Sequence, residues 1–155
     1  MKSLHVFVCL QFFCLSAAFS QTADNPSNIP SNLLKLYEQS VDHLNSFEND
    51  SAILLLDSIF SEIEGTEWED SPYSLRVQLR KGEALERDNK GDEALLLLQQ
   101  VKQKAQKEGV LDVYARSCIN LALQYEKLGM ANDCLENLQA AQSTLNQNPE
   151  LDKIY

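Results

Sequence analysis

The segment NLALQYEKLGMANDCLENLQAA, residues 120–141, decides the fold because its pattern is that of two helices joined by a short turn. Gly129 can adopt the left-handed conformation that ends a helix, and Asn132 or Asp133 can cap the next helix. On either side of this turn, apolar residues recur every three or four positions, the spacing of one helix face: Leu121, Ala122, Tyr125 and Leu128, then Cys134, Leu138 and Ala141. The segment therefore predicts an antiparallel helical hairpin.

These residues resemble the tetratricopeptide repeat (TPR) family, whose pattern combines large, small and aromatic residues with a turn glycine. The matching positions are Cys118, Leu121 with Ala122, Tyr125, Gly129, Cys134, Leu138 and Ala141. Cysteine replaces the usual aromatic residue at 118 and the usual alanine at 134. The resemblance implies an α–α superhelix whose first helices line a groove for extended peptides or partner helices.

A second copy of the pattern lies forty residues earlier in the chain. Its members are Gly82, Leu85, Ala94, Leu98 and Val101, at the offsets of Ala122, Tyr125, Cys134, Leu138 and Ala141. A repeat at a fixed period indicates a solenoid. We therefore expect an all-α array over residues 31–147, with hairpins at about 31–64, 71–108 and 110–146. Ser71 followed by Pro72 is a strong helix start.

The first hairpin, residues 31–64, fits the repeat less closely. Ser40, Ala52, Leu56 and Ile59 align with the second hairpin at a shift of forty-two residues. In the alternative register, which we favour, Tyr37, Val41 and Leu44 face inward. Ser31 is the expected cap of its first helix, and Asp50 or Ser51 that of its second. We expect Gly91 and Asp92 to form the turn of the middle hairpin.

Residues 1–20 have the order of a secretory signal peptide, with Lys2, an apolar run and then small residues before Gln21. An uncleaved anchor is the alternative. Residues 21–30 are polar and hold two prolines, which predicts a flexible lead-in. The resemblance and this export signal together suggest an exported bacterial protein, periplasmic or extracellular. A net charge of −10 argues against nucleic acid or anionic lipid as the main partner.

No residue combination predicts catalysis, a cofactor or a metal site, so we expect a protein that is not an enzyme. His43 would be the only histidine left after cleavage of residues 1–20. The acids of residues 62–70 match no calcium loop and predict a solvated turn. Cys118 and Cys134 should lie too far apart for a disulfide, because helix spacing and axial offset together exceed the ~7 Å limit between Cα atoms. We expect both to be small packing residues.

The candidate binding residues are arginines expected on or near the groove side of the first helices, namely Arg76, Arg80, Arg87 and Arg116. They are mixed there with Glu83, Glu86 and Glu126. An arginine cluster can bind a carboxylate or an acidic peptide. The alternative is that the arginines pair with nearby glutamates, as Glu83 can with Arg87 four residues later.

Residues 148–155 look like the start of a further or capping first helix. Either the native chain continues beyond them or a partner covers the apolar side of the last hairpin. Two functions remain open. The first is a protein–protein interaction module outside the cytoplasm, and the second is the N-terminal sensory segment of a longer membrane-anchored sensor kinase or transcription regulator.

Overall fold

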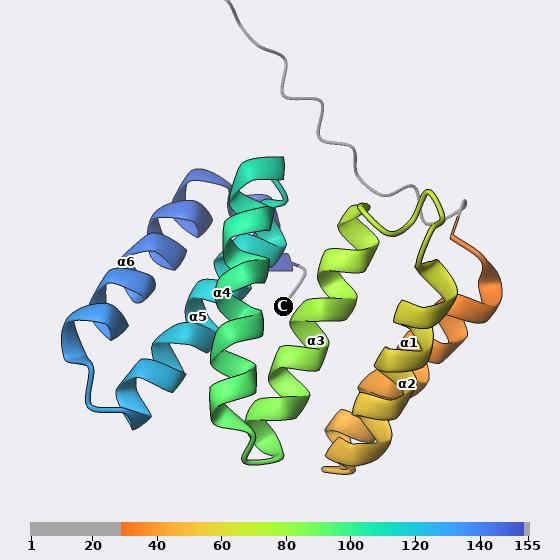
Figure 1. Ribbon diagram of the computed structural model, residues 1–155. Helices are drawn as coiled ribbons and strands as arrows, with labels where there is room; N and C mark the ends of the chain where they lie inside the picture. The colour runs from red at the N-terminus through yellow and green to blue at the C-terminus, as the bar shows by residue number, and fades with distance from the viewer. Residues whose placement is uncertain (1–28, 154–155) are drawn as a thin grey trace, which may run out of the picture.

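The computed structural model describes residues 29–153, and these residues form helices and turns without strands. The helices are α1 Ser31–Asn45, α2 Asn49–Ile63, α3 Pro72–Arg87, α4 Gly91–Glu108, α5 Leu111–Lys127, α6 Ala131–Gln147 and the short 3-10 helix η2 Pro149–Lys153. Each α-helix packs on the one before it, and α3 also contacts α1 and α5. Figure 1 shows α2 and α4 in front of α1 and α5, so first and second helices form two layers. This is the all-α solenoid of three hairpins that the repeat pattern predicts.

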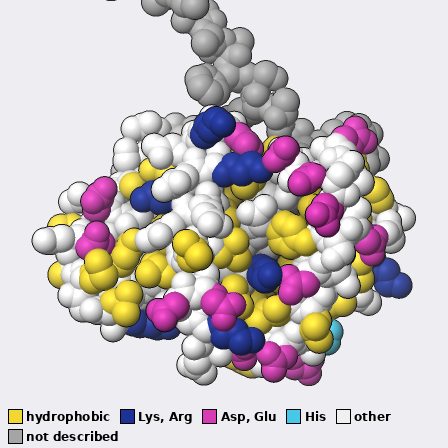
Figure 2. All heavy atoms as spheres, in the orientation of Figure 1, with side chains coloured by type: hydrophobic (Ala, Val, Ile, Leu, Met, Phe, Trp, Pro, Cys, Tyr) yellow, Lys and Arg dark blue, Asp and Glu magenta, His cyan; other side chains and the backbone are white. Residues whose placement is uncertain are grey.

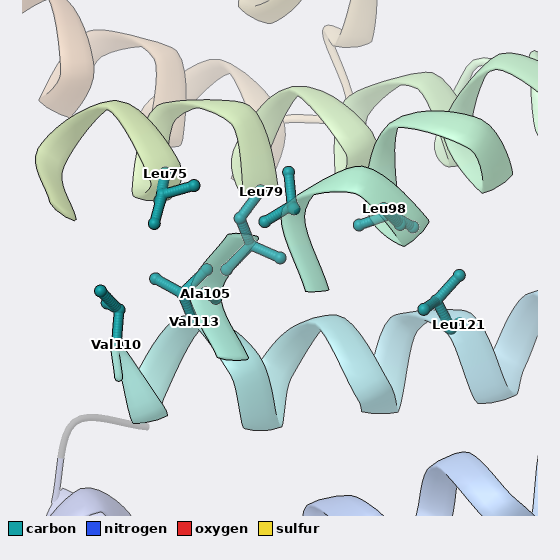
Figure 3. Packing of buried hydrophobic residues seen from close by; sticks show 8 residues of the cluster. Leu75, Leu79, Leu98, Ala105, Val110, Val113 and Leu121 are labelled. Carbon is teal, nitrogen blue, oxygen red and sulfur yellow. The ribbon is translucent and has the colours of Figure 1, made fainter. Parts of the chain in front are cut away.

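The main hydrophobic core joins the second hairpin to the third. Aliphatic residues of α3, α4 and α5 bury their side chains against one another (Figure 3), among them Leu75, Leu79, Leu98, Ala105, Val113 and Leu121. Full burial of one such leucine contributes about 1.5–3 kcal/mol. The hairpins are therefore held together by side chains that lie between them as well as within them.

Gly82 allows α3 and α4 to approach closely. A Cβ atom on Gly82 would lie 2.7 Å from Cδ2 of Leu98, closer than real Cβ contacts. The repeat alignment places Ser40 of α1 and Ala122 of α5 at the equivalent positions, and both are buried. Each hairpin thus has a small residue where its two helices meet.

The first hairpin departs from the register that we favoured. Ser40 is fully buried and donates a hydrogen bond from Oγ to the Tyr37 carbonyl oxygen at 2.6 Å. Leu44 is buried as expected, but Tyr37 and Val41 are only half-buried. The favoured register is therefore wrong at this position, because Ser40, the equivalent of Gly82, is buried and Val41 is only half-buried.

The three hairpin turns share one geometry. A single residue in the left-handed region follows each first helix, with φ of 62° at Phe47, 60° at Asn89 and 72° at Gly129. The next backbone N–H then donates to a carbonyl five residues earlier, at 2.9, 2.9 and 2.8 Å, respectively. This is the Schellman arrangement that satisfies the last carbonyls of a helix. The left-handed turn expected at Gly129 is confirmed.

Most of the helix caps that we expected differ from those in the structure. Only Ser71 caps as predicted, by accepting a hydrogen bond from the Ser74 backbone N–H at 3.2 Å. The N-cap positions of α1, α2, α4 and α6 are Pro30, Glu48, Lys90 and Met130, without a side-chain hydrogen bond. The caps expected at Ser31, Asp50 or Ser51, and Asn132 or Asp133 are therefore wrong, as is the turn at Gly91 and Asp92. Within each hairpin, the turn runs directly into the next helix, so the residue after the left-handed one takes the cap position.

The two ends of the chain were expected to hold a leader and a further helix. Residues 1–28, which include the proposed signal peptide and most of the lead-in, lie outside the described part of the chain. At the other end, residues 149–153 form η2, a 3-10 helix packed on α6. Within residues 29–153, each helix is too short or too polar to cross a bilayer.

Candidate functional site

The sides of α1, α3 and α5 that carry polar residues make up the candidate site, which we call the first-helix face. It is defined by Tyr37, Arg76, Arg80, Glu83, Arg87, Asp112, Arg116 and Asn120. All four arginines of the chain are among these residues. The predicted arginines therefore lie on adjacent first helices, because α3 packs between α1 and α5.

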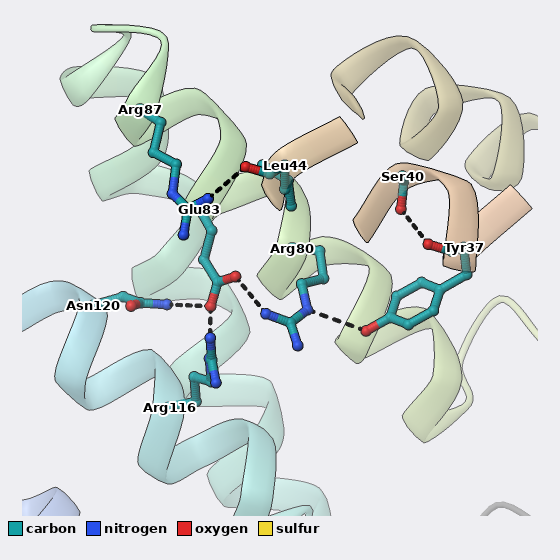
Figure 4. Close-up of polar contacts among 8 residues, drawn as sticks. All are labelled: Tyr37, Ser40, Leu44, Arg80, Glu83, Arg87, Arg116 and Asn120. Atoms are coloured by element: carbon teal, nitrogen blue, oxygen red, sulfur yellow. Dashed lines mark hydrogen bonds and ion pairs between the residues drawn. The ribbon is translucent and has the colours of Figure 1, made fainter. Parts of the chain in front are cut away.

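Glu83 is the centre of the first-helix face, and three side chains converge on its carboxylate (Figure 4). Arg80 donates from Nη1 to Oε2 at 2.7 Å. From α5, Arg116 donates from Nε and Asn120 from Nδ2 to Oε1, at 2.7 and 2.9 Å. Glu83 is only 6% exposed, so its charge is buried together with its partners. The alternative interpretation, in which the arginines pair with nearby glutamates, is confirmed for Arg80, which lies three residues before Glu83. The example expected for it, Glu83 with Arg87, is wrong, because Arg87 bonds to the Leu44 carbonyl oxygen.

The protonation of Glu83 follows from this arrangement. Burial alone would raise the pKa of its carboxyl group. The charges of Arg80 and Arg116, with hydrogen bonds from Arg116 and Asn120, outweigh burial and lower the pKa below its ordinary value. Glu83 is therefore ionised at neutral pH and holds both guanidinium groups in place.

Arginine side chains also connect the hairpins to one another. Arg80 also donates from Nε to the Tyr37 hydroxyl oxygen of α1 at 3.3 Å. Arg87 donates to the Leu44 carbonyl oxygen at 3.0 Å, close to the end of α1. Nε of Arg76 bonds to Oδ2 of Asp112 in α5 at 2.9 Å. Polar contacts thus run across all three first helices.

Three residues of this face were not predicted, namely Tyr37, Asp112 and Asn120. Two of them had a signal in the sequence. Asp112, Arg116 and Asn120 follow one another at intervals of four, which places them on one side of a helix. Tyr37 had no such signal, because its contact with Arg80 depends on how α1 packs against α3.

The predicted repeat-signature residues are mostly structural. Burial is complete or nearly so for Gly82, Leu85, Ala94, Leu98, Val101, Leu121, Ala122 and Ala141. Tyr125 and Cys134 are half-buried, and Leu138 is 46% exposed. The packing role expected for Leu138 is therefore not fulfilled in this structure. Leu98, its equivalent, is covered by α5, whereas Leu138 belongs to α6, the last α-helix of the described residues.

The other sequence candidates lie away from the first-helix face. Nδ1 of His43 contacts Oε2 of Glu48 at 2.5 Å in the first turn. Both Cys118 and Cys134 are free thiols, and burial raises the pKa of Cys118. In the segment between α2 and α3, Asp70 pairs with Lys104 at 2.7 Å. Within residues 29–153, His, Cys, Asp and Glu side chains form no group of three or more arranged to hold a metal ion.

Comparisons with known proteins bear on the fold. Neither a protein-family model nor a curated protein sequence matches the chain. Among solved structures, it resembles nearly identical TPR-like repeats from a Podosopora anserina protein described as a kinesin light chain. The match has a TM-score of 0.66, 21% identity and coverage of 77% of this chain. A second crystal structure of those repeats, which carries one substitution, matches with a TM-score of 0.62, 21% identity and coverage of 78% of this chain.

This chain spans less than two thirds of each matched structure, 57% and 58% of their lengths. The matched structures are TPR-like, and the order of helices here agrees with the TPR pattern in the sequence. This chain therefore has a TPR-like fold.

Proposed function

We propose that this protein is a non-enzymatic module that binds another protein outside the cytoplasm. In this proposal, a peptide or partner helix lies along the first-helix face and presents a carboxylate to its arginines. The TPR-like fold supports an interaction role in general. The arginine network supports this particular surface.

The observation that carries the proposal is the gathering of all four arginines of the chain on the first-helix face. Arg76, Arg80 and Arg116 pair there with the carboxylates of Glu83 and Asp112, and Arg87 bonds to a carbonyl oxygen. The chain as a whole is acidic, with a net charge of −10. A cluster of arginines on an acidic protein favours an anionic partner at that place.

The geometry of the network also suits a carboxylate. Arg76, Arg80 and Arg116 keep 34%, 24% and 29% of their side chains exposed while hydrogen bonds fix their orientation. A guanidinium group held in place loses less entropy when it binds a carboxylate. The expected ligand is therefore a peptide with an acidic side chain or a free C-terminal carboxylate.

Export is the second part of the proposal. It is supported by the order of charge, apolar run and small residues in residues 1–20. We expect protein recovered from the host envelope to begin at Gln21. N-terminal sequencing of the envelope and cytoplasmic fractions tests this, and an intact Met1 in the cytoplasm alone would refute it.

Peptide selection tests the binding surface. The chain from Gln21 is used to select binders from a random peptide library that displays free C-termini. We expect enrichment of acidic peptides, and weaker binding by Arg76→Gln. Lys107→Gln removes the same charge from an exposed site on α4 and serves as the matched control. Equal binding of the selected peptides to wild type, Arg76→Gln and Lys107→Gln would rule out this surface.

A further inference from the structure

The last hairpin exposes a group of large apolar side chains that we call the end face. It consists of Ile119 and Leu123 of α5 and Leu135 and Leu138 of α6, which are 38%, 48%, 54% and 46% exposed. Figure 2 shows hydrophobic side chains gathered at the left of the molecule, over α6. Single exposed leucines are ordinary, but a group on two packed helices is a candidate interaction surface.

The second hairpin has an equivalent face, and α5 covers it. The residues forty positions earlier are Leu79, Glu83, Leu95 and Leu98. Leu79 and Leu98 are buried with residues of α5, and Leu95 packs against the same cluster. Glu83 bonds to Arg116 of α5. All four equivalents thus contribute to the interface with α5.

We propose that the end face binds an amphipathic helix in the pose that α5 adopts on α3 and α4. In that pose α5 inserts aliphatic residues such as Val113 and Leu121 against Leu98 and its neighbours. The partner helix presents aliphatic residues at the same spacing, eight positions apart, to Leu138 and Leu135. This second surface is independent of the first-helix face and of any carboxylate ligand.

One substitution between the two copies sets the specificity of the end face. Glu83 accepts hydrogen bonds from Arg116 and Asn120 of α5, but its equivalent on the end face is Leu123. A partner arginine placed beside Leu123 would lose hydration without gaining a carboxylate. The partner helix therefore carries apolar residues at the two positions where α5 has Arg116 and Asn120.

The acidic residues of α6 take no part in this pose. They are Asp133 and Glu136, and their equivalents on α4, Glu93 and Leu96, stay exposed although α5 is bound. The end face therefore recognises a partner helix through apolar contacts.

Two peptides with the α5 sequence test the proposal. Both span residues 110–127, are held helical by a lactam bridge on the solvent side and carry Cys118→Ala to prevent oxidation. One keeps Arg116 and Asn120, and the other carries Arg116→Leu and Asn120→Leu. Each is titrated into the chain from Gln21 while the methyl NMR signals of the isoleucines and leucines are recorded. Circular dichroism verifies that both peptides are helical.

We expect the apolar peptide to shift the signals of Ile119, Leu123, Leu135 and Leu138 with a Kd about tenfold or more below that of the other peptide. Leu138→Glu should abolish binding. Leu96→Glu, at a 59% exposed leucine of α4, is the matched control and should bind normally.

Three outcomes would overturn the proposal. The first is the absence of saturable binding by a helical apolar peptide. Equal affinities for the two peptides would be the second, because Leu123 would then confer no selectivity. The third is self-association of the chain that Leu138→Glu abolishes, which would assign the end face to a second copy.

Discussion

Glu83 of α3 accepts a hydrogen bond from Nε of Arg116 in α5 at 2.7 Å, across thirty-three positions of sequence. This contact links the second hairpin to the third through a buried charge. In Glu83→Gln, two guanidinium groups lose their carboxylate, and we expect the free energy of unfolding to fall by about 3–5 kcal/mol. Urea unfolding followed by circular dichroism measures the loss.

Glu86→Gln is the matched control for this substitution. Glu86 pairs with Lys127, whose side chain is 60% exposed, so the change should cost less than about 1 kcal/mol. Equal losses in the two variants would show that burial of the Glu83 carboxylate adds nothing to the stability of the array.

The same carboxylate makes stability depend on pH. The pKa of Glu83 is lower in the folded chain than its ordinary value of 4.5, which applies to the unfolded chain. Its contribution is therefore fully present above pH 4.5 and is lost as the pH falls through the lower folded-state pKa. We expect the free energy of unfolding to decrease as the pH falls from 4.5 through that folded-state pKa.

Glu83→Gln isolates this contribution, because it removes the titrating group and leaves the other carboxyl groups unchanged. Below pH 4.5 the unfolding curves of wild type and variant should converge. A constant difference between them down to a pH of about 2 would contradict the assignment to Glu83.

The repeat predicted the second and third hairpins well because one period of forty residues governs both. Positions such as Gly82 and Ala122 are fixed by close packing, and close packing limits which residue types fit. The register of the first hairpin was harder to predict, because its shift of forty-two residues differs from the period of forty and two registers fitted the sequence. Ser40 decides between them only through its burial, which the sequence does not show.

The binding surface was predicted less completely than the fold. Periodicity placed the arginines on first helices, but it could not show which carboxylates reach them. Asp112 lies thirty-six residues from Arg76, and their contact requires α3 and α5 to be adjacent. The exposure of Leu138 was not apparent either, because its sequence position is the same as that of buried Leu98.

Gly82→Ala should destabilise the chain, although alanine has a higher helix propensity than glycine. The new Cβ would lie 2.7 Å from Cδ2 and 2.8 Å from Cγ of Leu98, so the buried leucine must move. Overpacking of this kind costs about 1–3 kcal/mol. Thermal unfolding measures the effect.

Gly91→Ala is the control for helix propensity. The nearest atom to its new Cβ is Oε1 of Gln124 at 3.7 Å, an ordinary contact. We expect this variant to be at least as stable as wild type. Combining Gly82→Ala with Leu98→Ala should cost less than the sum of the two single changes. Simple additivity would show that the clash with Leu98 is not the cause.

Phe47→Gly should stabilise the chain. Phe47 has φ of 62° and its side chain is 81% exposed, so a bulky residue occupies a left-handed turn with little burial in return. The equivalent turns use Asn89 and Gly129, which tolerate that conformation. Relief of the backbone clash is worth about 1 kcal/mol, partly offset by the greater freedom of glycine in the unfolded chain.

Phe47→Ala separates the backbone from the ring. Alanine removes the aromatic group but keeps the Cβ atom, so the strain remains and the free energy of unfolding should stay close to that of wild type. A gain with glycine and none with alanine would establish strain at this turn. If both variants lose stability to the same extent, the ring itself stabilises the first hairpin, and the turn carries no removable strain.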